Sequence, residues 1–142
     1  MDYSNLLKSA KLKATIQRVT LLEIIDHDGH SSIDDIYTVT KESMPTLSLA
    51  TIYKNILLLL EKGILEEVAI SGKKSKYEIK KSDHIHLICQ TCGSVEDKHL
   101  DKKIEESIDI YIDEDSFHIS KSHINLYGIC KKCNEQETLI YF

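Results

Sequence analysis

Four side chains that bind metal ions well occur in one short segment, HIHLICQTC, from His84 to Cys92. Two histidines separated by one residue come first, and two cysteines separated by two residues follow. Imidazole nitrogen and thiolate sulfur differ in softness and therefore suit different metal ions. The segment consequently predicts two kinds of metal site, for which other parts of the chain must supply the remaining ligands.

The four cysteines of the chain form two C-x-x-C pairs with 37 residues between them. This spacing lets both thiolates of a pair reach one ion, and a closed site of four thiolates is typical of structural zinc. Disulfides seldom persist in a reducing cytoplasm, which further favours metal binding. The alternative is two unrelated pairs of buried thiols. We predict one structural Zn²⁺ held by Cys89, Cys92, Cys130 and Cys133.

The two histidines predict a second, weaker site. Residues two apart in a strand share a face, so His84 and His86 can bind one ion, and Asp97 on a returning strand offers an oxygen ligand. Such ligands suit Fe²⁺, Mn²⁺ or Zn²⁺. Structural zinc contributes about 10–16 kcal/mol, comparable with the stability of a whole small domain, so the four-cysteine site is too permanent for sensing. The alternative is that the histidines bind no metal.

The N-terminal half is predicted to begin with four helices. Thr15, Ser32 and Ser48 are of types that cap helix starts, and Ser32 begins a capping-box pattern with Asp35. Gly63 suits the end of the fourth helix. The expected helices are Asn5–Leu12, one that begins after Thr15, one from Ser32 to about Ser43, and one from Ser48 to Gly63.

A basic hairpin is expected next, because the strand-like runs Glu66–Ile70 and Lys76–Lys80 are joined by the sequence SGKKS. Its turn carries Lys73 and Lys74. Helices followed by such a hairpin are typical of a winged helix-turn-helix, in which one helix enters the major groove and the wing meets phosphates. On the fourth helix, the exposed polar side carries Thr51, Lys54 and Asn55. The alternative is a small α+β domain with a solvated lysine turn.

The C-terminal half is predicted to mix strands with one helix. Ile85–Ile88 reads as a strand, and apolar residues recur every four positions from Leu100 to Ile112, as in an amphipathic helix. Alternation predicts further strands at Phe117–Ile119 and Ile124–Leu126, with a break between them because the phase changes.

Composition and charge place the boundary between the halves just before His84. The chain is 42% apolar and 29% charged, as is normal for a folded soluble protein. Residues 1–81 carry 12 basic and 11 acidic side chains, a net charge of +1, whereas residues 82–142 carry 6 and 12, a net charge of −6. The sequence has no pattern of a signal peptide or membrane span, so we expect a cytoplasmic protein with no membrane partner. The predicted domains are residues 1–81 and 82–142.

Five segments together resemble the ferric-uptake-regulator family of bacterial repressors, and they extend over nearly the whole chain. They are LKATIQR (Leu12–Arg18), HSSIDDIY (His30–Tyr37), LSLATIYKNI (Leu47–Ile56), DHIHLICQTCG (Asp83–Gly93) and YGICKKC (Tyr127–Cys133). The resemblance implies an α+β fold, with an N-terminal winged helix-turn-helix and a small C-terminal α/β dimerisation domain. It also implies a homodimer that binds a double-stranded DNA operator and is not an enzyme.

The resemblance further implies which residues bind metal and DNA. A regulatory Fe²⁺ or Mn²⁺, with Zn²⁺ possible in vitro, would be bound between the domains. Its ligands would be His30, Glu78, His84, His86 and Asp97. Tyr53 and Lys54 on the recognition helix and Lys13 near the DNA backbone are implied contacts, whereas Thr51 and Asn55 are weaker candidates. For Tyr53 the alternative is half-buried packing.

Peroxide is the favoured signal, iron is the alternative, and zinc or another metal is a third possibility. The D-H-x-H segment, Lys54-Asn55 and Asp97 resemble the peroxide-stress branch, in which Fe²⁺ reacts with peroxide and a ligand histidine, here His30 or His84, is oxidised. Glu78 is more similar to iron-sensing members. Some members have a third metal site that uses a histidine at the position occupied here by Ser122. Glu105 and His123 could contribute to such a site only if the register of the strand shifted by one residue.

Two other classes of protein fit fewer observations. A zinc hydrolase could use His84, His86 and an acid around a water, but the chain has no H-E-x-x-H motif and no phosphate-binding glycine loop. A zinc-stabilised protein-interaction module without DNA affinity would fit the cysteines alone.

Overall fold

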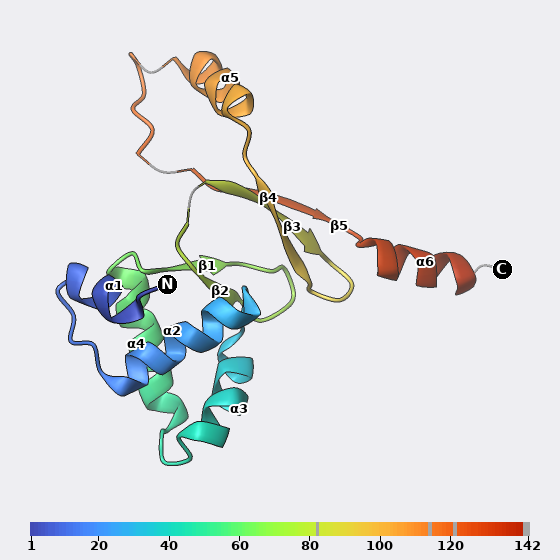
Figure 1. The fold of residues 1–142 in the computed structure, drawn as a ribbon. Coiled ribbons are helices and arrows are strands. Elements are labelled where there is room, and N and C mark those ends of the chain that lie inside the picture. The colour runs from blue at the N-terminus through green and yellow to red at the C-terminus, as the bar shows by residue number, and fades with distance from the viewer. Residues whose placement is uncertain (82, 114, 121, 141–142) are drawn as a thin grey trace. The chain divides into compact units, whose positions relative to one another are not determined.

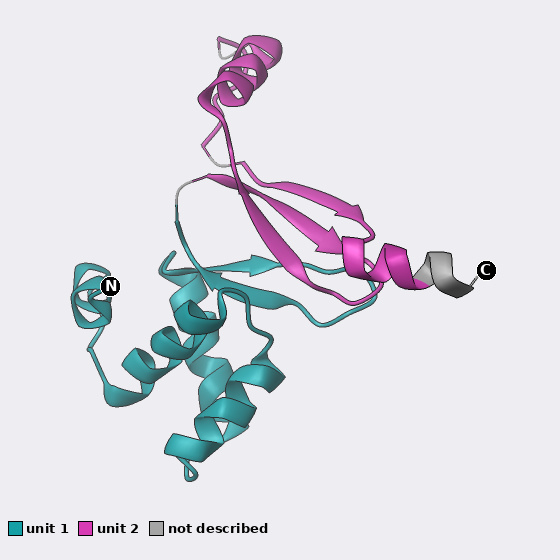
Figure 2. Cartoon of the chain, turned by 45° about the vertical axis from the view of Figure 1, so that its right-hand side comes forward, with its two compact units in different colours: residues 1–81 teal, residues 82–142 magenta. Residues whose placement is uncertain are grey.

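The computed structural model describes residues 1–81, 83–113, 115–120 and 122–140 (Figure 1). The chain divides into two compact units, residues 1–81 and 82–142 (Figure 2). None of the helices in the described part of the chain is long and apolar enough to cross a membrane.

Residues 1–81 begin with four helices, and three of their start signals are confirmed. Thr15, Ser32 and Ser48 each accept a hydrogen bond from the backbone N–H three residues ahead. The first helix begins earlier than expected because Asp2 caps it by accepting the N–H of Asn5 at 3.0 Å. The helices are α1 (Tyr3–Ser9), α2 (Ile16–Asp28), α3 (Ile33–Ser43) and α4 (Leu49–Glu61).

An antiparallel hairpin completes this unit, formed by β1 (Leu65–Val68) and β2 (Lys76–Ile79). Both strands are shorter than the sequence predicts, and Gly63 and Gly72 adopt the positive φ angles of 72° and 71° that the flanking turns require. The helices and the hairpin share one apolar core, which includes fully buried residues of α2, α3 and α4. The elements and their order are those of a winged helix-turn-helix.

Residues 82–142 contain a three-stranded sheet in the order β4-β3-β5. The strands are β3 (His84–Cys89), β4 (Val95–His99) and β5 (Ile124–Gly128). β3 pairs antiparallel with β4 and parallel with β5. A parallel neighbour requires a long crossover, which contains helix α5 (Lys102–Ile112). The prediction of an α+β fold is therefore confirmed.

Two expectations for this unit were wrong or incomplete. The segment Phe117–Ile119 forms no strand: Asp113, at φ 57°, ends α5, and its carbonyl accepts the N–H groups of Ser116 and Phe117 in a turn. Phe117 is 63% exposed, so it packs against no sheet within the part of the chain that the structure describes. Helix α6 (Lys131–Ile140) was not predicted.

Candidate metal centres

The four cysteines come together because the sheet pairs β3 with β5 in parallel. Cys89 ends β3 opposite Gly128, and the N–H of Gln90 donates to the Gly128 carbonyl at 2.8 Å. The chain after β5 therefore passes the end of β3, where Cys92 lies in the turn to β4. The four sulfur atoms of Cys89, Cys92, Cys130 and Cys133 lie within 4.8 Å of one another.

Backbone donors favour the thiolate form at the centre of this cluster. The N–H of Cys130 donates to Cys89 Sγ at 3.3 Å and that of Cys92 does so at 3.5 Å. These bonds, that of Cys130 first, lower the pKa of Cys89 to about 6. Cys133 behaves oppositely, because hydrogen bonding with Cys130 and then burial raise its pKa to about 12. A divalent cation would stabilise all four as thiolates, and the donor set fits tetrahedral zinc.

A second group of ligand atoms lies in a row across the same sheet. His86 of β3 is directly opposite Asp97 of β4 on one side and Asn125 of β5 on the other. His84 lies two residues away on the same face, and the two Nε2 atoms are 2.8 Å apart. Asp97 Oδ1 is 3.4 Å from His84 Nε2 and 3.5 Å from His86 Nε2. Three ligand atoms, two nitrogen and one oxygen, therefore lie close together. Such ligands suit Fe²⁺ or Mn²⁺ better than four thiolates do.

His30 and Glu78, which the resemblance implies as ligands, form a pair within residues 1–81. Ser31 and Tyr77 exchange two backbone hydrogen bonds, of 3.0 and 2.8 Å, in an isolated antiparallel bridge. Their neighbours His30 and Glu78 are therefore brought together, and His30 Nε2 lies 2.8 Å from Glu78 Oε2. Glu78 is buried, with a relative exposure of 1%. The pair offers an imidazole and a carboxylate, which also suit Fe²⁺ or Mn²⁺.

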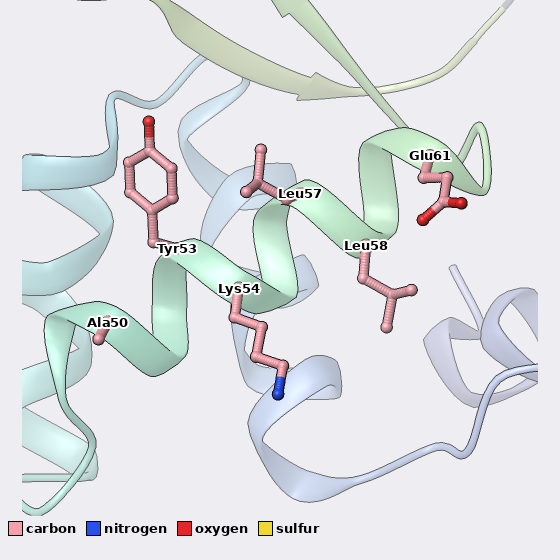
Figure 3. A pocket seen from close by; sticks show the side chains of 6 residues that line it. All are labelled: Ala50, Tyr53, Lys54, Leu57, Leu58 and Glu61. Carbon is pink, nitrogen blue, oxygen red and sulfur yellow. The ribbon is translucent and has the colours of Figure 1, made fainter.

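The DNA-contact candidates on α4 differ in how exposed they are and in whether they already form hydrogen bonds within the protein. Tyr53 is 50% exposed and Lys54 is exposed, and both line a groove on α4 that Leu57 and Glu61 extend (Figure 3). Asn55 is already engaged, since its amide donates to the Thr51 carbonyl at 3.0 Å and its oxygen accepts Arg18 Nε at 3.2 Å.

Arg18 links the recognition helix to the segment before α2. Besides Asn55, it contacts Lys13, whose backbone carbonyl accepts a second guanidinium N–H at 3.0 Å. The Lys13 side chain is exposed. Sequence reasoning used Arg18 only as part of a resembling segment and missed this connection. Its charge and its place as the third residue of α2 gave no signal of the partner.

The basic hairpin turn is tied to α3. The Lys74 ammonium forms an ion pair with the Asp34 carboxylate, and both side chains are largely exposed. Lys73, the other predicted phosphate contact, is also exposed. The turn therefore contacts α3 through a charge pair that the sequence analysis did not anticipate.

Glu105 and His123 do not join a third cluster of metal ligands in the part of the chain that the structure describes. Glu105 lies on α5, and His123 is exposed immediately before β5.

Comparison with known proteins agrees with the fold. Residues 9–127 match the model of the Ferric uptake regulator family. The peroxide operon regulator of Bacillus subtilis (strain 168) is 30% identical over 132 residues, which is 92% of this chain and 90% of that protein. The ferric uptake regulation protein of the same organism is 30% identical over 139 residues, 93% and 92% of the two chains.

A solved structure of similar fold is the Campylobacter jejuni peroxide stress regulator. It matches with a TM-score of 0.72 and 34% identity, covering 94% of this chain and all of that chain (100%). The chain belongs to the ferric uptake regulator family, whose members are metal-dependent, dimeric, DNA-binding transcriptional regulators.

Proposed function

We propose that this protein is a cytoplasmic repressor whose DNA binding requires a regulatory Fe²⁺ or Mn²⁺, and that peroxide is its signal. It is a regulator and not an enzyme. The observation that carries the proposal is the pairing of His84 and His86 with Asp97, which supplies three nitrogen and oxygen ligand atoms. Three ligands are fewer than the six of the octahedral geometry that Mn²⁺ prefers, so such an ion accepts further ligands.

His30 and Glu78 are the proposed additional ligands. They belong to the N-terminal unit, whereas His84, His86 and Asp97 belong to the C-terminal unit. An ion bound by both sets would fix the angle between the units. In a homodimer, that angle sets the spacing of the two recognition helices for half-sites about one DNA turn apart. Metal and DNA would then bind with reciprocal coupling, typically about 1–3 kcal/mol.

The four cysteines would hold Zn²⁺ permanently and keep the C-terminal unit folded for dimerisation. Their sulfur atoms already lie within 4.8 Å of one another, and backbone N–H groups stabilise Cys89 as a thiolate. This division leaves reversible binding to the nitrogen and oxygen ligands.

DNA would be bound by α4 and by basic side chains around it. Tyr53 and Lys54 would face bases and phosphates in the major groove, Thr51 and Asn55 would lie beside them, and Lys13 would meet the backbone. Lys73 and Lys74 would meet phosphates from the hairpin turn. Because such contacts release counterions, the measured affinity should fall steeply as salt rises.

Peroxide is favoured as the signal because relatives with that printed function match over most of the chain. A bound Fe²⁺ would supply the redox chemistry toward peroxide, by which a C–H of a histidine ring would become C–OH while the second peroxide oxygen leaves as water. His30 and His84 are the proposed targets because the resemblance to the peroxide-stress branch implies them, and each presents an imidazole nitrogen beside a carboxylate of the site. Iron sensing is the second candidate, since Glu78 carries one more methylene than the aspartate typical of the peroxide branch and thereby changes reach and ligand geometry.

Two measurements test the proposal. In a gel-shift assay with DNA from upstream of the protein's own gene, Mn²⁺ should produce binding, and failure with and without Mn²⁺ would instead support an interaction module. For the signal, the protein is loaded anaerobically with Fe²⁺, exposed to peroxide and digested for mass spectrometry. One added oxygen on His30 or His84, together with loss of DNA binding, supports peroxide sensing. Unmodified peptides would support iron sensing.

A further inference from the structure

Asn125 lies on the opposite side of His86 from the acidic ligand Asp97. In the sheet, His86 is paired with Asp97 on β4 and with Asn125 on β5, so the three side chains share one face. The His86 ring uses its two nitrogen atoms for different neighbours. Nε2 is near Asp97 Oδ1 and His84 Nε2, whereas Nδ1 is 3.0 Å from Asn125 Oδ1.

The Asn125 contact determines where the proton of a neutral His86 ring must be. An amide oxygen only accepts hydrogen bonds, so Nδ1 must be the donor. A neutral imidazole carries one N–H, so Nε2 then has a lone pair directed toward Asp97 and His84. A metal-binding histidine needs that lone pair, and a partner on the other nitrogen commonly supplies it by fixing the tautomer and ring orientation.

The surroundings of Asn125 favour such a role. His86 is buried, with a relative exposure of 5%. Asn125 is half-buried on β5, the strand that pairs in parallel with β3. Sheet pairing fixes both backbones, so the amide oxygen is held in place before any ion arrives. An orienting group that is already placed removes the conformational cost of ordering the ring on metal binding.

We propose that Asn125 is a positioning residue for the regulatory metal: its amide oxygen accepts the Nδ1–H of His86 and thereby keeps Nε2 available to the ion. This inference rests on the proposed regulatory role of His86. Asn125 itself touches no metal. Its contribution is to the affinity for Fe²⁺ and Mn²⁺, not to the four-cysteine zinc site, whose ligands do not include His86.

The test compares three zinc-loaded, full-length proteins: wild type, Asn125→Leu and Asn125→Asp. Leucine matches asparagine in size but accepts no hydrogen bond, whereas aspartate keeps an acceptor and adds negative charge. Mn²⁺ affinity is measured by calorimetric titration, and zinc content by elemental analysis. We expect Asn125→Leu to weaken Mn²⁺ binding about 10- to 100-fold, the usual effect of losing such a partner, and Asn125→Asp to bind as tightly as wild type or more tightly. Zinc should remain at one ion per chain.

The order of Mn²⁺ affinities among the variants distinguishes a positioning role of Asn125 from a packing role. If Asn125 only filled space in the sheet, the apolar leucine would be the better replacement and the buried charge of aspartate the worse one. Equal Mn²⁺ affinity of Asn125→Leu and wild type, or weaker binding by Asn125→Asp than by Asn125→Leu, would overturn the inference.

Nitrogen NMR of the wild-type histidines provides a readout that needs no variant. In the zinc-loaded protein without Mn²⁺, neutral His86 should carry its proton on Nδ1, and a proton on Nε2 would contradict the proposal. His86→Ala distinguishes this failure from failure of the proposed function. If wild type binds no Mn²⁺, or if His86→Ala binds it unchanged, both the function and the inference are wrong. If only the Asn125 results fail, the regulatory site stands without this residue.

Discussion

His30 Nε2 lies 2.8 Å from Oε2 of Glu78, although the two residues belong to distant segments of the chain. The contact depends on the two-bond bridge between Ser31 and Tyr77, which aligns the loop after α2 with β2. A buried carboxylate next to an imidazole nitrogen offers two ligand atoms to a divalent cation, which would give the carboxylate a charged partner.

Glu78→Gln should therefore weaken regulatory metal binding. The amide keeps the size of the side chain but removes its charge, so we expect Mn²⁺ affinity to fall at least about tenfold, or 1.4 kcal/mol, and Mn²⁺-dependent DNA binding to fall with it. Calorimetry and gel-shift assays measure the two effects. Glu67→Gln, on the exposed side of β1, is the matched control and should leave both unchanged. Unaltered Mn²⁺ affinity in Glu78→Gln would show that Glu78 is not a ligand of the regulatory metal.

Cys92→Ser should remove zinc and destabilise the C-terminal unit. Cys92 Sγ lies 3.8 Å from Cys130 Sγ, so its loss opens the four-sulfur cluster. Structural zinc contributes about 10–16 kcal/mol, more than a small unit can lose and remain folded. Elemental analysis should show zinc well below one ion per chain, and sedimentation should show loss of the dimer.

Ser94→Ala is the control for that experiment, because the Ser94 hydroxyl lies 3.2 Å from Cys92 Sγ without being a ligand. It should retain zinc and the dimer. A Cys92→Ser protein with full zinc content and an intact dimer would show that the cluster is not a structural zinc site.

Asp34→Asn should increase DNA affinity. Asp34 pairs with Lys74, so removing its charge releases the ammonium to bind phosphate. The pair is exposed and contributes less than about 1 kcal/mol to folding, so the melting temperature should change little. Fluorescence anisotropy at several salt concentrations should show tighter binding and a steeper salt dependence than wild type.

Asp35→Asn is the matched control, since it removes the same charge from the same helical turn. It should tighten DNA binding less than Asp34→Asn does. Equal effects of the two variants would mean that only net charge matters. Lys74→Ala should in turn weaken binding and lower the salt slope by about one.

Arg18 and Asn55 should be energetically coupled. Arg18 Nε donates to Asn55 Oδ1 at 3.2 Å and thereby ties α2 to the recognition helix. We expect Arg18→Ala and Asn55→Ala each to cost about 1 kcal/mol of unfolding free energy, and the double variant to cost less than the sum. Urea denaturation of the four proteins gives the coupling energy. Strict additivity would show that the hydrogen bond does not contribute.

Several parts of the structure could be predicted because they depend on neighbours in the sequence. Thr15, Ser32 and Ser48 cap their helices through an N–H only three residues away. Each C-x-x-C pair likewise brings its own two sulfur atoms close. Predicting the four-cysteine site therefore needed only the further assumption that the two pairs meet. The prediction of a strand at Phe117–Ile119 was wrong because it depended on more than sequence neighbours. Alternating residues form a strand only when a partner strand is available.

The sequence by itself determined the starts of α2, α3 and α4, the basic turn and the kinds of metal that its cysteines and histidines could bind. Only the tertiary structure decided that His86 lies between Asp97 and Asn125, that Arg18 holds Asn55, and that Lys74 is paired with Asp34. These partners are between 11 and 40 residues apart in the chain. Caps and C-x-x-C pairs follow from local backbone geometry, whereas strand pairing and packing determine which distant side chains meet.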